Sequence, residues 1–321
     1  MDKIRIGPDD AEQRLDRFVR KYLRGATLPT VYKLIRTKQV TVNGKKCRPE
    51  RRLVEGDVVI LHPAERRAQE LKGKAKHREK GNAPELTVIY EDDDVLAVAK
   101  PPFLLVHPGE DGDEPTVTGW LERYVADRGA VTFRPALAHR LDRLTSGVVL
   151  IGKSAAGLRG LTEAIKKGRV EKLYLALVVG EPPTDGEIDV PLRREDLFAA
   201  DRPKVRVDTK RGKRAVTRWH VLARSGGMSL LRVQILTGRT HQIRVHLRHL
   251  GHPVVGDPTY GNRELNTRLQ GRHGLWRQWL HASSVALDHP VTGARLEIRA
   301  PLPEDLARVL VGEGFPPQVL D

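Results

Sequence analysis

The sequence predicts an α+β protein with a large mixed, mainly antiparallel sheet, flanking helices and a small N-terminal α+β domain. Three observations predict this: a basic helix–helix–hairpin pattern near the N-terminus, a charged stretch poor in apolar residues, and then many short apolar runs. The connections between these runs are mostly too short for crossover helices, which favours antiparallel pairing. We expect a small domain at 1–62, a flexible linker at 63–84 and a larger domain at 85–321. The length of 321 residues fits two domains.

The N-terminal pattern consists of two short helices and a hairpin. The second helix is expected to begin at Pro29 or Thr30. An Asn43-Gly44 pair follows the strand-like residues 40–42 and indicates a hairpin turn, and residues 55–61 supply a second strand. The apolar residues at helical spacing are Leu15, Phe18, Val19 and Tyr22, then Val31, Leu34 and Ile35.

Positive charge is concentrated at this end of the chain. Residues 1–80 hold 22 Lys and Arg against 11 Asp and Glu, whereas the remainder holds 34 against 30. A basic module on a nearly balanced body indicates binding of a polyanion, and a solvated charged surface is the alternative. The linker 63–84 is charged and punctuated by Gly and Pro, so it cannot bury enough apolar surface to order itself.

Several classes of protein do not fit the sequence. Cys47 is the single cysteine, so no intramolecular disulfide forms, which favours a reducing compartment. No segment has the apolar length of a signal peptide or of a membrane span, and we expect a cytoplasmic protein. Walker, GxGxxG, HExxH and CxxC motifs are absent from the sequence. The acidic cluster 91–94 could be a metal site, but a hairpin tip is favoured. We expect no metal and no cofactor.

The larger domain begins with two strands around that acidic cluster. A strand near 147–153 then leads into a helix with Ser154 as N-cap and Gly168 as its end. Further strands are expected at about 172–180, 215–223, 228–236 and 294–300.

The stretch HRLDRLTSG at 139–147 places a carboxylate between two arginines. In an extended segment Arg140 and Asp142 share a face, and residues 145–147 fit a tight turn into the next strand. A neighbouring guanidinium favours the ionised carboxylate, which suits a nucleophile or weak base better than a general acid. The alternative is a structural Arg–Asp ion pair.

Two later stretches also contain candidate residues. In EKLYLAL, Lys172 and Tyr174 share one face of a strand, although a strand tyrosine is usually a core residue. In LTGRTHQIRVHLRHLGHP, a helix is expected from about Thr240, with Arg244 and His241 on one face. This face suits an RNA phosphate or a buried carboxylate, and a solvated basic face is the alternative. The predicted apolar stripe is Ile243, Leu247 and Leu250, with Gly251 as the helix end.

The blocks HRLDRLTSG, KLYLA and GRTHQIRVHLRHLGHPVVGDPTYG, in this order, resemble the signature of the RluA-type pseudouridine synthases. The resemblance runs from about residue 86 to 301, and the segment 14–62 resembles the small RNA-binding domain first seen in a ribosomal small-subunit protein. The combination is similar to the RluC-like branch, which acts on large-subunit ribosomal RNA. The family often has Asn-Lys-Pro-x-Gly near the second strand. Here Ala99 and Phe103 depart from that pattern, which leaves the local turn open.

The resemblance implies the pseudouridine synthase fold and the isomerisation of uridine within RNA without a cofactor. It implies that Asp142 is the essential aspartate, acting as a nucleophile on the ribose or base or as a base. Arg244 would pair with Asp142, and Tyr174 would stack on the uracil. Arg140 would fill the stack when the target nucleotide flips out.

The implied partner is RNA, with large-subunit ribosomal RNA first, and a monomer is expected. The remaining RNA contacts are expected from Arg239, His241, Arg14, Arg17, Arg36, Lys38 and Lys45. Three alternatives stay open: a non-catalytic ribosome-assembly factor, a synthase acting on tRNA, and a metal-dependent hydrolase built on residues 91–94.

Overall fold

The structure is a computed structural model. It describes residues 2–23, 25–62, 84–109, 114–125, 130–195 and 204–319. The expected linker therefore lies outside the described residues, except for residue 84. Within the described ranges, no helix combines the length and apolar character that crossing a bilayer requires.

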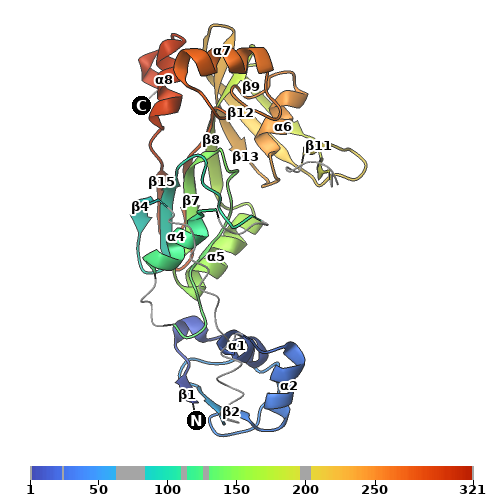
Figure 1. Cartoon of the computed structure of the whole chain (residues 1–321), viewed down its shortest axis with the longest axis vertical. Coiled ribbons are helices and arrows are strands. Elements are labelled where there is room, and N and C mark those ends of the chain that lie inside the picture. Colours follow the sequence, from blue (N-terminus) through green and yellow to red (C-terminus); the bar gives the residue numbers. More distant parts are fainter. Residues whose placement is uncertain are drawn as a thin grey trace.

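The N-terminal unit is a three-stranded antiparallel sheet packed against two helices (Figure 1). Its core is formed by the apolar residues predicted at helical spacing, among them Leu15, Phe18 and Val31. The strand order is β1-β3-β2. The elements are β1 (Asp2–Arg5), α1 (Leu15–Tyr22), α2 (Leu28–Arg36), β2 (Val40–Val42) and β3 (Val58–Leu61).

Two details of this unit differ from the sequence prediction. Helix α2 begins at Leu28, earlier than Pro29 or Thr30, because the Thr27 hydroxyl accepts a hydrogen bond from the Thr30 amide and caps the helix. Strand β1 was not predicted. The tight turn was predicted correctly: Asn43 and Gly44 both have positive φ, and Asn43 also accepts a hydrogen bond from the amide of Val58.

The main sheet has the order β4-β5-β7-β14-β8-β13-β12-β9, with β15 beside β14 and β6 beside β7. Among the described strands of this sheet, β14 and β7 are the parallel pair and the other pairs are antiparallel. The prediction of a mixed, mainly antiparallel sheet is confirmed. The strands are β4 (Thr87–Glu91), β5 (Val95–Lys100), β6 (Ala136–Leu137), β7 (Ser146–Gly152), β8 (Glu171–Val179), β9 (Asp185–Asp189), β12 (Val216–Ser225), β13 (Met228–Ile235), β14 (Leu280–Asp288) and β15 (Arg295–Arg299).

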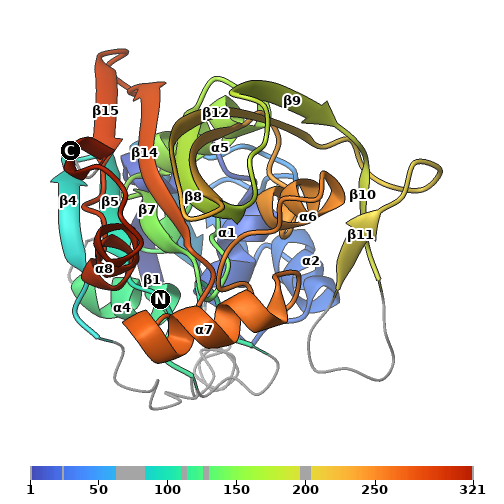
Figure 2. The same cartoon turned by 90° about the horizontal axis from the view of Figure 1, so that it is seen from above.

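Helices flank this sheet, as Figure 2 shows. Helix α5 packs on β7. Ser154 caps it by accepting a hydrogen bond from the Gly157 amide, and Gly168 follows with positive φ, both as predicted. A separate two-stranded sheet, β10 (Leu192–Arg194) and β11 (Val205–Val207), lies beside α6. The helices are α4 (Val117–Tyr124), α5 (Ala155–Lys166), α6 (Gln242–His249), α7 (Arg263–His273) and α8 (Glu304–Gly312).

The central strand β14 joins the two halves of the sheet, and the sequence analysis did not predict it. Gly147 of β7 lies against it with a φ of +124°. A Cβ atom there would come within 2.1 Å of the Ala282 carbonyl oxygen, so only glycine fits. The predicted turn at 145–147 is wrong. The turn spans residues 142–145 instead, where the Thr145 amide donates to the Asp142 carbonyl over 3.1 Å. Strand β7 then begins at Ser146.

A buried carboxylate connects the N-terminal unit to the larger one. Asp10 is 1% exposed, and it accepts hydrogen bonds from the amides of Val131, Thr132 and Phe133 at 2.7, 2.9 and 3.0 Å. The Thr132 hydroxyl donates to the same carboxylate. Asp9 accepts a further bond from the Ala155 amide at the start of α5. These contacts place the N-terminal unit beside α5 (Figure 1).

Candidate active site

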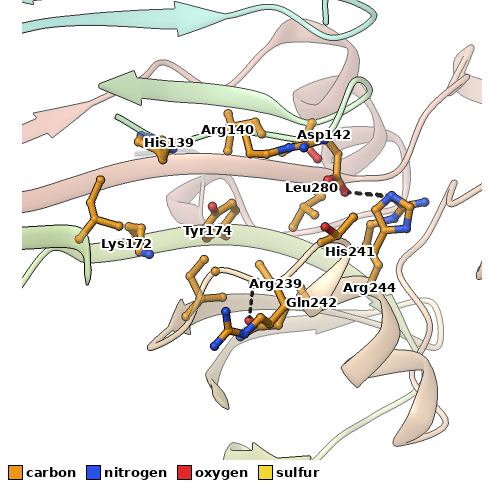
Figure 3. A pocket seen from close by; sticks show the side chains of 17 residues that line it. His139, Arg140, Asp142, Lys172, Tyr174, Arg239, His241, Gln242, Arg244 and Leu280 are labelled. Carbon is orange, nitrogen blue, oxygen red and sulfur yellow. Dashed lines mark hydrogen bonds and ion pairs between the residues drawn. The ribbon is translucent and has the colours of Figure 1, made fainter. Parts of the chain in front are cut away.

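A cavity of about 240 Å³ lies where the segment 139–145, strand β8 and the segment 238–244 meet (Figure 3). It opens in the larger unit, on the side of the sheet that carries α6. Every candidate residue predicted in this unit lines it: Arg140, Asp142, Tyr174, Arg239, His241 and Arg244. The sheet therefore collects in one place side chains that are up to about a hundred positions apart in the chain.

Asp142 pairs with Arg244, as expected. The Arg244 Nη1 atom donates to Asp142 Oδ2 over 3.0 Å, and the side chains are 5% and 21% exposed, respectively. The arginines adjacent to Asp142 in sequence do not hold it in the same way: Arg143 pairs with Glu114 at 3.1 Å, and Arg140 lies exposed at the cavity. The carboxylate is thus oriented by a guanidinium that is distant in sequence but adjacent in space, and it still reaches the cavity.

Arg244 is itself held by a second carboxylate, Asp257, which the sequence analysis missed as a functional residue. Its Nε and Nη2 atoms donate to Asp257 at 2.6 and 2.9 Å, a bidentate pair. Asp257 is buried and also accepts the amides of Thr259 and Tyr260. Burial alone would lower the pKa of Arg244, but the hydrogen bond and charge of Asp257, followed by the charge of Asp142, raise it overall. Arg244 therefore stays charged and has one nitrogen aimed at Asp142.

His241 lies near the same Asp142 oxygen as Arg244. It precedes α6 with a φ of +54°, and its Nδ1 atom lies 3.0 Å from the Tyr260 hydroxyl. That hydroxyl also accepts a hydrogen bond from the Val205 amide, which fixes its position beside the imidazole ring. Nε2 is 4.0 Å from Asp142 Oδ2. Burial lowers the pKa of His241, and the charge of Asp142 only partly opposes this, so the ring is neutral near pH 7.

Tyr174 forms part of the cavity wall between these groups and the far end of the cavity (Figure 3). It is buried on β8. Burial, and then the charge of Asp142, raises the pKa of Tyr174. Its phenol therefore stays protonated at neutral pH, and Tyr174 lies close enough to Asp142 for the charge of that carboxylate to act on it.

The side chain of Gln242 fixes the loop that precedes α6. Its Oε1 atom accepts the Thr237 hydroxyl and the Arg239 amide at 2.7 and 3.0 Å, while Nε2 donates to the Val216 carbonyl. Arg239 is exposed at the rim of the cavity. The predicted apolar stripe is partly wrong, because Leu250 lies beyond the end of α6 and is exposed, whereas the residues 242–247 are all buried.

The departures near Ala99 leave the turn intact. Phe103 adopts a φ of +64°, a conformation that favours glycine and costs a larger residue about 1 kcal/mol. Lys100 is buried, and its ammonium donates to the carbonyls of Pro101, Leu104 and Arg143 at 2.8, 2.9 and 3.1 Å. Its three donors thus tie this turn to the segment that carries Asp142.

The candidate RNA-binding residues of the N-terminal unit lie apart from the cavity. Arg14 is engaged within the unit, because its Nε and Nη2 atoms donate to buried Asp16 at 3.1 and 2.7 Å. The other four predicted cations have exposed side chains: Arg17, Arg36, Lys38 and Lys45.

The acidic cluster 91–94 forms a hairpin tip. Asp92 accepts the amides of Asp94 and Val95 at 2.8 and 2.7 Å, and Ser154 donates to Asp94. Lys153 pairs with Glu91. Over the part of the chain that the structure describes, no group of three or more acidic, histidine or cysteine side chains is arranged to hold a metal ion.

Comparison with known proteins identifies the family. A model of the RNA pseudouridylate synthase family matches residues 94–249, and an S4 domain model matches residues 13–59. The chain is 38% identical over 309 residues to the ribosomal large subunit pseudouridine synthase C of Escherichia coli K12, covering 96% of this chain and 95% of the relative. The enzyme of the same name from Vibrio vulnificus is 35% identical over 310 residues, with the same coverage.

Solved structures agree with this result. The human RNA pseudouridylate synthase domain containing 1 is 27% identical, with a TM-score of 0.55, and the match covers 70% of this chain and 86% of that one. The human domain containing 4 has a TM-score of 0.57 at 24% identity, covers 70% and 92%, and supports the fold. The chain belongs to the RluA-type RNA pseudouridine synthases and carries an N-terminal S4 domain.

Proposed function

We propose that this pseudouridine synthase converts uridines of large-subunit ribosomal RNA. The observation that carries the proposal is the Asp142 carboxylate at the cavity, oriented by Arg244 over 3.0 Å. The ribosomal substrate is supported by the relatives, which are named for that subunit and match over nearly the whole chain. We further propose that the enzyme acts as a cytoplasmic monomer with domains at 1–62 and 85–321, joined by the linker.

Asp142 is the proposed catalytic residue. The reaction breaks the bond between ribose C1′ and uracil N1 and then joins C1′ to uracil C5. An ionised carboxylate can act as a nucleophile on the ribose or base, or can accept a proton from the ribose. Arg244 holds this carboxylate in one orientation at the cavity through their 3.0 Å hydrogen bond. The ring of Tyr174 is the proposed stacking surface for the base, and its protonated hydroxyl is available for proton transfer.

RNA binding is proposed to divide between the two units. At the cavity, Arg140 would occupy the space left by a flipped nucleotide, and Arg239 and His241 would contact the strand around it. On the S4 domain, exposed cations would bind phosphates without reading sequence. These cations are Arg17, Arg36, Lys38 and Lys45. Arg14 instead donates to Asp16 within the domain.

The proposal is tested with purified protein and two RNA samples. One is a transcript of the large-subunit ribosomal RNA, and the other is a pool of tRNA. Pseudouridine is mapped in each RNA after incubation with the wild type and with Asp142→Asn. Pseudouridine in the ribosomal transcript, made by the wild type alone, is the expected result. Conversion confined to tRNA would mean that tRNA, and not ribosomal RNA, is the substrate. Binding of ribosomal RNA without any conversion would favour the assembly-factor alternative.

A further inference from the structure

Lys172 is a buried cation in the cavity that the proposed roles do not use. It lies on β8, two residues before Tyr174 and facing the same way, and it is 9% exposed. Figure 3 shows it on the side of Tyr174 remote from Arg244. Lysine side chains are rarely buried unless their charge is paired.

Other buried lysines of the described chain are satisfied. The ammonium of Lys100 donates to three carbonyls, and that of Lys153 donates to Glu91 and to the carbonyl of Asp92. Lys172, in contrast, has no hydrogen-bond acceptor or ion-pair partner among the residues that the structure describes. The ammonium nitrogen is not sealed within the protein but reaches the open cavity, where a ligand could supply the acceptors that the described residues do not.

The titratable neighbours of Lys172 in the cavity, His139 and Tyr174, are uncharged. His139 accepts the Leu150 amide at Nε2, and burial, followed by the charge of Lys172, lowers the pKa of His139 to about 4, so its ring is neutral. Tyr174 stays protonated. Gly238 leaves the space beside the ammonium open, since even an added Cβ would remain 4.0 Å away. The remaining charged or titratable groups of the cavity are Asp142, Arg140, Arg239, His241 and Arg244.

The position of Lys172 favours a base over a phosphate as its ligand. In base-flipping enzymes the base enters the pocket while the phosphodiester strand stays at the mouth. The exposed cations Arg140 and Arg239 lie at that mouth. Lys172 is nine-tenths buried, and on an extended strand it lies roughly 6.5 Å from Tyr174 along β8. A uracil stacked on Tyr174, with its ribose at Asp142, would direct an oxygen-bearing edge toward Lys172.

We propose that Lys172 binds a carbonyl oxygen of the target uracil and stabilises the negative charge that the base acquires during the reaction. This inference rests on the proposed function. When C1′–N1 breaks, the electron pair stays on N1, and the charge spreads onto O2 and O4. Asp142 compensates the ribose either by bonding to C1′, a bond that breaks again when C5 attacks C1′, or by taking the C2′ proton, which returns to C2′ when C5 bonds to C1′. C5 then bonds to C1′, C5 loses its proton, and N1 gains one. Lys172 keeps its proton throughout.

This interaction would accelerate the reaction because it strengthens as the bond breaks. A neutral carbonyl is a modest acceptor, whereas the uracil anion is a full charge beside a desolvated ammonium. By analogy with oxyanion-stabilising donors, its loss should lower the rate by roughly 10²–10³-fold. RNA affinity should change little, because the phosphate contacts are elsewhere.

The test compares Lys172→Met and Lys172→Arg with the wild type on an RNA that the wild type converts. Lys153→Met is the matched control, a buried lysine outside the cavity. Single-turnover rates, RNA affinity and melting temperature are measured for each. We expect Lys172→Met to lose about 10²-fold or more in rate, to bind RNA within threefold of the wild type, and to melt no lower than it. Lys153→Met should melt lower, because it removes the ammonium that donates to Glu91 and to the Asp92 carbonyl, and should keep its rate per folded molecule.

A pH profile separates the catalytic role from a structural one. Burial lowers the pKa of Lys172, so the wild-type rate should fall as the pH rises through that pKa. The Lys172→Arg rate should lack this decline, because a guanidinium stays charged. Should Lys172→Met fail to fold, this comparison decides alone. A folded Lys172→Met with a rate within threefold of the wild type, or one whose defect lies wholly in RNA affinity, would overturn the inference. Failure of the wild type itself to convert any RNA would overturn the proposed function instead.

Discussion

The contact between the two units depends on Asp10, and Asp10→Ala should release it. Four donors from residues 131–133 converge on this carboxylate. Hydrogen bonds to a charged acceptor contribute about 1.5–3 kcal/mol each, and a buried donor left without an acceptor costs about 1–3 kcal/mol. Water can solvate the freed amides once the units separate, which limits the total. We expect the docked arrangement to weaken by about 3–6 kcal/mol.

Amide hydrogen exchange reports this change directly. Protection of the amides of Val131, Thr132 and Phe133 should fall by at least about 100-fold in Asp10→Ala, since 1.4 kcal/mol corresponds to a factor of ten. Asp9→Ala is the matched control, because Asp9 accepts a single bond, from Ala155 at 2.8 Å, and should cause a much smaller change at 131–133. The Asp10 variant should also bind a large RNA more weakly while its rate at saturating RNA is retained.

Two results would refute this reasoning. Unchanged exchange at 131–133 in a folded Asp10→Ala would mean that other contacts hold the units together, such as the Arg159–Glu12 pair at 3.1 Å. An equal loss of protection in Asp9→Ala would mean that the convergence of donors on Asp10 has no special weight.

Three further outcomes concern Asp142, its neighbour Asp257, and the buried His281 of β14. Asp142→Asn should reduce isomerisation by at least about 10³-fold in single-turnover conversion, while its RNA affinity in filter binding stays within threefold of the wild type. Residual activity near the wild type would remove Asp142 from the mechanism. Asp257→Ala should lower the free energy of unfolding by about 3–5 kcal/mol in urea, because it leaves the buried Arg244 charge without its main partner; a loss below 1 kcal/mol would contradict this. Burial lowers the pKa of His281 to about 4, so the unfolded chain binds a proton that the folded chain refuses, and stability present above pH 6.5 should be lost as the pH falls toward 4. Between pH 7.5 and 5 this amounts to about 2 kcal/mol, which urea unfolding of His281→Gln against the wild type should show as a flatter pH dependence.

The elements with a strong local pattern were predictable from sequence. Helices α1 and α5 follow apolar periodicity, α5 also begins at the visible cap Ser154, and Asn43-Gly44 fixes its turn by backbone preference alone. Strands β1 and β14 were missed because neither has a strong local pattern. β1 is four residues long with a single apolar residue, and β14 owes its place to pairing with β7 and β8, more than a hundred residues away in sequence. Such pairing leaves no local signal.

The site shows the same division between local and distant signals. Asp142 stood out because two arginines flank it, yet Arg143 pairs with Glu114, and the arginine that orients Asp142 lies 102 residues away. Family resemblance supplied Arg244, which spacing could not. Asp257 follows a glycine in a turn-like stretch and reads as a surface residue. A buried Val254-Val255 pair just before it is the signal that could have indicated a carboxylate turned inward.

The charges of the cavity, taken together, match the charge separation of the proposed reaction. Asp257 binds Arg244 through two hydrogen bonds and largely cancels its charge, which leaves Asp142 at one end of the cavity and Lys172 at the other, with the exposed Arg140 and Arg239 at the mouth. Breaking C1′–N1 leaves the ribose electron-poor and the base electron-rich. A carboxylate beside the ribose and an ammonium beside the base oppose that separation without moving, which is how a preorganised site lowers a barrier. The same reasoning explains why Asp257 is sealed while Asp142 is open: an accessible Asp257 would compete for the substrate, and a sealed Asp142 could not reach it.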